Sequence, residues 1–96
     1  MLVKTGKGNW TVQFQKCPVE REGKQCIDTL ARLFLHNAFC SKIHYGDAWA
    51  HQHPNDQYNK IKGKKIALKR LLQKANTFTK EDRTAFWAEF KKEFNL

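Results

Sequence analysis

The sequence predicts an α+β domain in which a three-stranded antiparallel sheet is followed by two C-terminal helices packed on one face of that sheet. Two observations lead to this fold class. The N-terminal half alternates apolar and polar residues with the period of two that is typical of strands, whereas the C-terminal half repeats apolar residues every three or four positions, as helices do. The chain has 96 residues, of which 41% are hydrophobic, so a single domain with one core is expected over residues 1–96.

Three strands are expected, over residues 9–16, 26–36 and 41–53. The first buries one face, since polar side chains alternate with the apolar side chains of Trp10, Val12 and Phe14. Pro18 ends this strand. The second segment also fits a helical repeat, and a strand is favoured because the first strand needs partners. In the third segment, Gly46 indicates a bulge or a close backbone approach.

The first helix is expected over residues 56–75, with Asn55 or Asp56 as its N-cap. Its apolar residues fall on one arc of the helical projection, which consists of Tyr58, Ile61, Leu68, Leu71, Leu72 and Ala75. Gly63 lies inside this helix, where glycine costs about 1 kcal/mol relative to alanine. This glycine therefore marks either a close contact or a tolerated weak point.

The second helix is expected over residues 80–94. Thr79 is its predicted N-cap, and Glu81 and Asp82 follow in the first turn, where the helix dipole favours acidic side chains. Its apolar stripe consists of Phe86, Trp87, Phe90 and Phe94. Because the connection between the two helices is short, we expect them to be antiparallel neighbours.

Positive charge is concentrated on the first of these helices. The formal net charge of the chain is +9, and residues 55–96 hold eleven Lys or Arg against five Asp or Glu. Residues 57–76 contain no acidic residue and seven basic ones, which are Lys60, Lys62, Lys64, Lys65, Lys69, Arg70 and Lys74. A helix that lysines merely solubilise usually carries interleaved glutamates, so their absence favours a surface that binds a polyanion. We therefore expect these seven residues to contact nucleic acid.

The three cysteines, Cys17, Cys26 and Cys40, form no Cys-x-x-Cys pair, which favours a reducing, cytoplasmic setting over a disulfide scaffold. A zinc site is a weaker hypothesis, in which His51 and His53 lie on one strand face and join Cys17 and Cys26. The paired spacing of zinc motifs is missing, so neither a metal nor another cofactor is expected. The apolar runs are too short to span a bilayer, and no membrane partner is expected.

No catalytic constellation emerges, so an enzyme is not expected. The sequence contains no nucleophile elbow, no phosphate-binding glycine-rich loop and no recognisable spacing of serine or cysteine with histidine. Glu81 and Asp82 are explained by helix capping. Asp28 and Asp47 lie in the predicted strand region, where each can approach a histidine.

Two alternatives to a phosphate-contacting helix remain open. Trp10, Tyr45 and Trp49 would stack on single-stranded bases if the sheet has an open face. A protein–protein module would instead expose aromatic side chains, with Trp10, Trp49 and Trp87 as candidates, and would bind an acidic host protein. The oligomeric state is also open, since an exposed sheet edge would support dimerisation.

Three stretches in the C-terminal half resemble a recurring pattern in small phage and prophage proteins of unsettled function. These stretches are residues 53–58 (HPNDQY), 63–68 (GKKIAL) and 79–87 (TKEDRTAxW). The resemblance implies a protein from a mobile element that acts by binding, for example by inhibiting a host defence such as a CRISPR effector. A basic inhibitor of this kind would engage a guide RNA, a target DNA or an acidic protein groove.

A second resemblance concerns residues 63–67 (GKKxA), which follow the three predicted strands. They are similar to the end of a double-stranded-RNA-binding domain, in which a Lys-Lys-x-Ala helix start spans phosphates across a groove. That domain opens with a helix, which residues 1–9 are too short and too rich in glycine to form. The similarity therefore indicates phosphate-contacting chemistry rather than that fold.

Together these patterns predict a small, basic, non-enzymatic binding protein that is encoded by a phage and acts in the host cytoplasm. Its expected partner is a nucleic acid or a host nucleoprotein complex, engaged through the lysine-rich helix. An acidic host protein is the first alternative partner. A small zinc-binding domain is the second alternative function.

Overall fold

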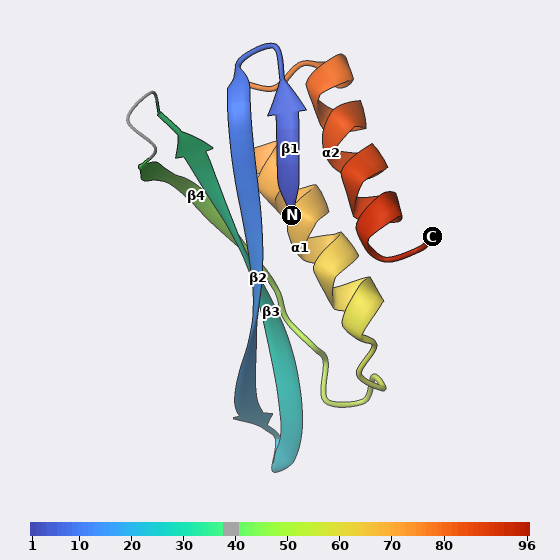
Figure 1. The fold of residues 1–96 in the computed structure, drawn as a ribbon. Coiled ribbons are helices and arrows are strands. Elements are labelled where there is room, and N and C mark those ends of the chain that lie inside the picture. The colour runs from blue at the N-terminus through green and yellow to red at the C-terminus, as the bar shows by residue number, and fades with distance from the viewer. Residues whose placement is uncertain (38–40) are drawn as a thin grey trace.

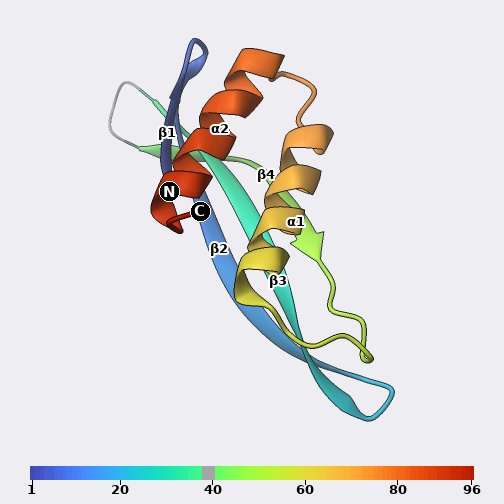
Figure 2. The ribbon, with the colours of Figure 1, turned by 90° about the vertical axis from the view of Figure 1, so that its right-hand side faces the viewer.

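A computed structural model describes residues 1–37 and 41–96 of the chain. Its sheet is antiparallel with the strand order β1-β2-β3-β4, and both helices cover the same face (Figures 1 and 2). The elements are β1 (Leu2–Thr5), β2 (Gly8–Arg21), β3 (Lys24–His36), β4 (Lys42–Ala50), α1 (Lys60–Lys74) and α2 (Lys80–Glu93). The α+β class and the two C-terminal helices are confirmed, but the sheet has four strands rather than three.

The strand that was not predicted is β1. It pairs antiparallel with the start of β2 across a tight turn at Gly6 and Lys7. Val3 enters the core and is 1% exposed, whereas Leu2 is 67% exposed. A strand of four residues with one buried apolar side chain is too short for a period of two to be recognised, which explains the omission.

β2 is longer than predicted, because it continues through Pro18 to Arg21 instead of ending near residue 16. The N–H and C=O of Val12 both bond to Met1, on the β1 side of the strand. Backbone groups alternate in direction along a strand, so those of Pro18 also point away from β3. Proline has no backbone N–H to donate. At position 18 the missing N–H would face the side on which no strand pairs with β2, so the proline is tolerated.

β2 and β3 form one long hairpin. Their pairing runs from Trp10 opposite Leu35 to Arg21 opposite Lys24, so residues 26–36 form a strand, as favoured from the sequence. The connecting residues are Glu22 and Gly23, with φ angles of 53° and 73°. Two consecutive positive φ values are what a two-residue turn of type I′ requires, and this turn matches the twist of the flanking strands.

The pairing of β4 with β3 contains the bulge that was expected near Gly46. The register shifts between Leu33 and Phe34, which leaves Tyr45 as the extra residue of β4. The ring of Tyr45 lies edge-on to Trp10, with centroids 5.0 Å apart. The bulge therefore places an additional aromatic ring at the border of the core.

The core lies between the sheet and the two helices. Its buried residues are Val3, Trp10, Val12, Ala31, Leu33, Ala48, Ala50, Ala67, Leu68, Leu71, Leu72, Phe78, Phe86 and Phe90. Trp10 is 2% exposed, and its Nε1–H donates to the hydroxyl oxygen of Thr5 at 3.0 Å. Its ring also contacts Phe78 edge-on, with centroids 4.9 Å apart. A large aromatic ring of β2 thus packs beneath the connection between the helices.

Both helices start at polar caps, and they run in opposite directions across the sheet (Figures 1 and 2). The N-cap of α1 is Asn59, whose side chain accepts from the N–H of Lys62 at 3.0 Å, rather than Asn55 or Asp56. The first helix therefore begins four residues later than predicted, and the third predicted strand ends at residue 50 rather than 53. Thr79 and Asp82 form the predicted N-terminus of α2 as a reciprocal capping box.

Gly63 marks a close contact between α1 and the sheet. A Cβ atom at this position would lie 2.6 Å from the hydroxyl oxygen of Thr29 on β3. Thr29 is 2% exposed, so its side chain has little freedom to move aside. The absence of a side chain at Gly63 therefore sets how closely the N-terminal half of α1 approaches the sheet.

Replacing Gly63 by alanine is expected to lower the free energy of unfolding by about 1–2 kcal/mol, because overpacking outweighs the gain in helix propensity. In a Thr29→Ala background the same replacement should be neutral or stabilising, since the hydroxyl oxygen is gone. Urea unfolding of the four proteins of this cycle measures the coupling. A Gly63→Ala protein that is stabilised equally in both backgrounds would contradict the close contact.

Candidate functional site

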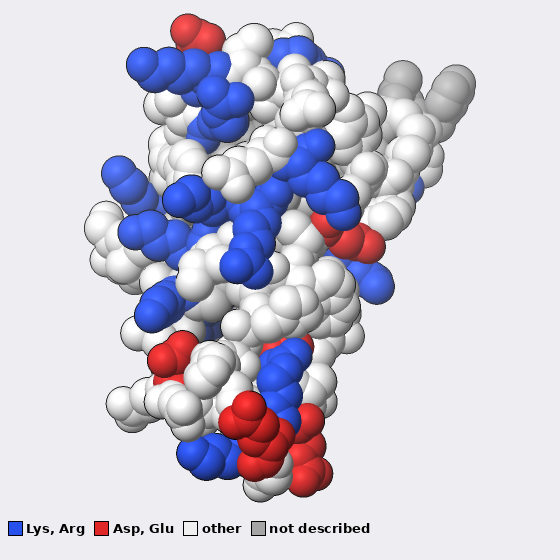
Figure 3. Space-filling model, turned by 180° about the vertical axis from the view of Figure 1, so that it is seen from behind, with Lys and Arg blue, Asp and Glu red and all other residues white. Residues whose placement is uncertain are grey.

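The outward face of α1 carries three exposed lysines, Lys62, Lys65 and Lys69. Their spacing of three and four residues places them on one side of the helix, opposite the buried Ala67 and Leu71. They span about 10 Å along the helix axis, which is roughly the length of three phosphates along one strand of a duplex. Seen from behind in Figure 3, Lys and Arg side chains spread across the middle of the molecule, whereas most of the visible acidic side chains lie at its lower end.

Arg70 and Lys74 lie on the side of α1 that adjoins β4. The guanidinium of Arg70 donates to the carbonyl of Trp49 at 2.9 Å, and the ammonium of Lys74 donates to the carbonyl of Asp47 at 3.2 Å. β4 is an edge strand, so these carbonyls would otherwise point into solvent without a strand partner. An arginine has five donors and a lysine has three, so both side chains keep donors for an anion.

Lys64 differs from the other predicted contact residues because its side chain turns inward. Its Nζ lies 4.6 Å from the ring centroid of Phe94 and 5.7 Å from that of Phe14. Burial lowers the pKa of Lys64, and the nearby charges of Lys60 and Lys16 lower this pKa further. Six of the seven predicted residues thus divide into an outward group, a group at the β4 edge and a lysine that faces α2. The seventh, Lys60, is exposed at the first position of α1.

The N-terminal turn of α1 adds to the positive potential of this surface. It contains no acidic residue, whereas the first turn of α2 contains Glu81 and Asp82. The N-terminal end of a helix carries a partial positive charge, which acidic side chains normally offset. In α1 this partial charge instead adds to the charges of Lys60 and Lys62.

Aromatic residues were predicted to stack on bases or to contact a protein. Of these, Trp49 lies exposed on the sheet face opposite the helices. Trp49 is 38% exposed and lies parallel to the ring of His51, with centroids 5.9 Å apart. The expectation for Trp10 is wrong, because this ring is buried in the core, and Tyr45 lies against it on the helix side. Trp87 belongs to α2, so the three tryptophans do not form one surface.

A buried carboxylate fixes the segment that leads from β4 to α1. Both oxygens of Asp28 accept from the guanidinium of Arg21, at 2.6 and 2.5 Å, and the side chain of Asp28 is 4% exposed. Asp28 also accepts from Nδ1 of His51 at 2.8 Å and from the backbone N–H of Gln52 at 3.0 Å. The hydrogen bonds from Arg21 lower the pKa of Asp28 far below its usual range, against the opposing effect of burial, and those from His51 and Gln52 add to the decrease.

The expected approach of two aspartates to histidines is therefore present. Asp28 contacts His51, and Asp47 lies 2.6 Å from Nε2 of His44. Asp47 also lies 3.8 Å from Nε of Arg32 on the neighbouring strand. Both carboxylates form hydrogen bonds or ion pairs with side chains of the same domain, and these contacts give them structural roles.

The four weaker metal candidates do not come together. His51 is bonded to Asp28, and Nδ1 of His53 accepts from the N–H of Asn55 at 3.1 Å. Both histidines follow the end of β4, so they do not share a strand face as expected. Cys26 is buried and Cys17 is partly buried, while Cys40 lies outside the described residues. Over residues 1–37 and 41–96, no group of three or more histidines, cysteines or acids is placed to hold a metal ion.

The fold and the surface define an antiparallel α+β domain with a basic helix on its outside. Comparison of the chain with family models, curated proteins and solved structures found no match. The resemblances to phage proteins and to a double-stranded-RNA-binding domain therefore remain predictions from the sequence. Within the described part of the chain, no helix combines the length and apolar composition needed to cross a membrane.

Replacing Asp28 by asparagine is expected to lower the free energy of unfolding by about 2 kcal/mol at neutral pH, because Arg21 loses its charged partner. The pKa of Asp28 is lower in the folded chain than the value near 3.9 of an unfolded aspartate. Its ionised form therefore contributes stability above about pH 4, and this contribution is lost as the pH falls below that value.

Urea unfolding of the original chain and the Asp28→Asn variant, measured from about pH 6 down to about pH 2, tests this assignment. The stability difference between the two proteins should shrink as the pH falls. A difference that stays constant over this range would show that the carboxylate charge of Asp28 does not fix the segment.

Proposed function

We propose that the protein is a non-enzymatic binding protein that contacts the phosphate backbone of a nucleic acid through the outward face of α1. The observation that carries this proposal is the group of three exposed lysines, Lys62, Lys65 and Lys69, on a helix without acidic residues. A lysine neutralises a phosphate as a point charge and needs no exact geometric fit. Such contacts release counterions and supply affinity that falls steeply with salt.

Two further features support this surface as the binding face. Arg70 and Lys74 extend its positive charge to the edge of β4, where both side chains keep free donors. The uncompensated N-terminus of α1 adds a partial positive charge at the other end. Because phosphate contacts fix position rather than sequence, the protein should bind with little sequence preference.

In its most concrete form, the proposal is that a phage encodes this protein and uses it against a host defence complex. The sequence resemblance described above supports this reading, and the charge of α1 suits a guide RNA or a target DNA held in such a complex. Inhibition would then require only that the protein covers phosphates that the complex must contact. An acidic surface of a host protein is the competing partner for the same lysines.

The proposal predicts that a variant with Lys62→Gln, Lys65→Gln and Lys69→Gln loses binding at moderate salt. The slope of log K against log salt concentration should fall by about 2 to 3, since each lost phosphate contact removes roughly one unit. Fluorescence anisotropy with labelled duplex DNA, single-stranded DNA and duplex RNA, at low and physiological salt, measures both quantities.

A matched control carries Lys4→Gln, Lys80→Gln and Lys92→Gln, which remove the same charge from exposed positions outside α1. This control should keep most of the affinity. Equal losses of affinity in both variants would show that the net charge of the protein, and not the position of the lysines on α1, accounts for binding. Failure of the original chain to bind any of the three nucleic acids at low salt would reject the proposal in favour of an acidic protein surface.

A further inference from the structure

β2 has a free edge over much of its length. β1 pairs with β2 over residues 8–11, and Met1 adds two hydrogen bonds at Val12. From residue 13 to residue 21, β2 pairs with β3 on one side, and no described strand lies on the other. Backbone groups alternate in direction, so the N–H groups of Phe14 and Lys16 point outward, together with the carbonyls of Phe14, Lys16 and Pro18.

The opposite edge of the sheet is treated differently. Along β4, Arg70 and Lys74 donate to the outward carbonyls of Trp49 and Asp47. Side chains that cover an edge in this way prevent another chain from pairing with it. The edge of β2 carries no such cover among the residues that the structure describes, although it is as long as the edge of β4.

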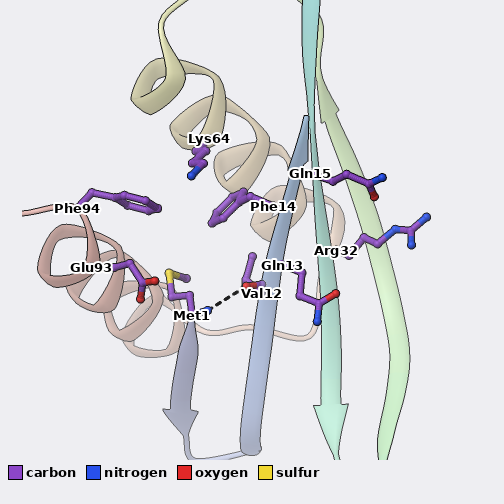
Figure 4. Close-up of a pocket in the computed structure, with 9 residues that line it drawn as sticks. All are labelled: Met1, Val12, Gln13, Phe14, Gln15, Arg32, Lys64, Glu93 and Phe94. Atoms are coloured by element: carbon purple, nitrogen blue, oxygen red, sulfur yellow. Dashed lines mark hydrogen bonds between the residues drawn. The ribbon is translucent and has the colours of Figure 1, made fainter. Parts of the chain in front are cut away.

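A hollow of about 460 Å³ follows this edge of β2 (Figure 4). Its lining includes Val12 and Phe14 from the helix side of β2 and Gln13 and Gln15 from the opposite side. The hollow therefore runs along the edge of the strand instead of lying on one face of the sheet. Residues 13–18 span roughly 20 Å, which is the length of an ordinary strand.

The residues around the hollow define the chemistry of its occupant. Phe14 and Phe94 are half-buried and offer an apolar wall, with their ring centroids 6.2 Å apart. The Nζ of Lys64 lies over both rings, and the charges of Lys16 and Lys60 are close enough to act on it. Lys64 and Arg32 thus line the hollow against one acidic residue, Glu93, and the charges of Lys16 and Lys60 lie near Lys64.

We propose that the free edge of β2, over residues 13–18, accepts an extended acidic segment of another protein, which adds a strand to the sheet. The backbone of that segment would bond to Phe14, Lys16 and Pro18. On the helix side it would place an apolar residue against Phe14 and Phe94. Two positions further along, acidic side chains would meet Lys16 and Lys64.

Charge selects this occupant over a second copy of the same chain. Pairing two β2 edges would bring Lys16, Lys60 and Lys64 of both copies together, in a protein whose net charge is +9. The same lysines attract a strand whose facing positions are glutamate or aspartate. The proposed segment and a nucleic acid would also occupy different surfaces, because Lys62, Lys65 and Lys69 point outward from α1.

The test uses a synthetic peptide of about eight residues that is long enough to form one strand. Leucine and two glutamates occupy alternate positions, and threonine fills the positions between them. Titrated into the ¹⁵N-labelled full chain, this peptide should shift the amide signals of Phe14 and Lys16 and protect both amides from exchange. Methylation of the peptide nitrogens that face β2 should weaken binding by at least about tenfold, because it removes backbone hydrogen bonds without changing the protein.

Two pairs of substitutions separate this site from the nucleic-acid surface. Lys16→Gln with Lys64→Gln should weaken peptide binding by about tenfold, since two charge contacts are lost. Lys62→Gln with Lys69→Gln removes the same charge from the outward face of α1 and should leave peptide binding unchanged. The second pair should weaken nucleic-acid binding more than the first, so either proposal can fail without the other.

Four outcomes would overturn the proposal. The first is the absence of shifts at millimolar peptide, and the second is shifts confined to β4. The third is equal binding of the methylated peptide, which would leave charge attraction without strand addition. The fourth is concentration-dependent dimerisation of the protein alone with protection of Phe14 and Lys16, which would assign the edge to a second copy.

Discussion

The placement of α1 depends on the ion pair between the buried carboxylate of Asp28 and the partly exposed guanidinium of Arg21. Arg21 and Asp28 lie on neighbouring strands near the turn of the β2–β3 hairpin. Asp28 also accepts hydrogen bonds from His51 and Gln52, in the segment that follows β4. That segment leads directly to the N-cap of α1, so the carboxylate fixes the point from which the helix starts. The close approach at Gly63 then fixes the depth of the helix on the sheet. Which lysines face solvent is decided by these two constraints together.

The elements that sequence patterns predicted well are those whose pattern repeats several times. Period-two alternation identified most of β2, and the apolar stripes identified α1 and α2. β3 was favoured over a helix because β2 needs a strand partner. β1 was not predicted because four residues are too few to show a period of two. Pro18 was wrongly predicted to end β2, because a proline is tolerated there only since no strand pairs with that edge. The start of α1 was misplaced by four residues, because the N-cap is Asn59 and not Asn55 or Asp56, and all three positions carry residue types that cap helices well.

The candidate surface was also predicted only in part from the sequence. Composition alone identified the seven basic residues of α1 as a group, because no acidic residue interrupts them. Their directions required the fold: Lys64 turns toward Phe94, while Arg70 reaches the edge of β4. The free edge of β2 had no signal in the sequence, since it results from a difference in length between two paired strands. Such a feature belongs to the pairing of the strands and to neither strand alone.

The strand order β1-β2-β3-β4 also has a consequence for how the chain folds. Every strand pairs with its neighbour in sequence, so strand pairing involves short loop closures and can proceed while the chain is still being synthesised. The inner face that carries Trp10, Val12 and Leu33 has no cover until both helices have formed, and these helices come last along the chain. Until α1 and α2 dock on it, a sheet that has already paired therefore exposes these apolar side chains to other chains.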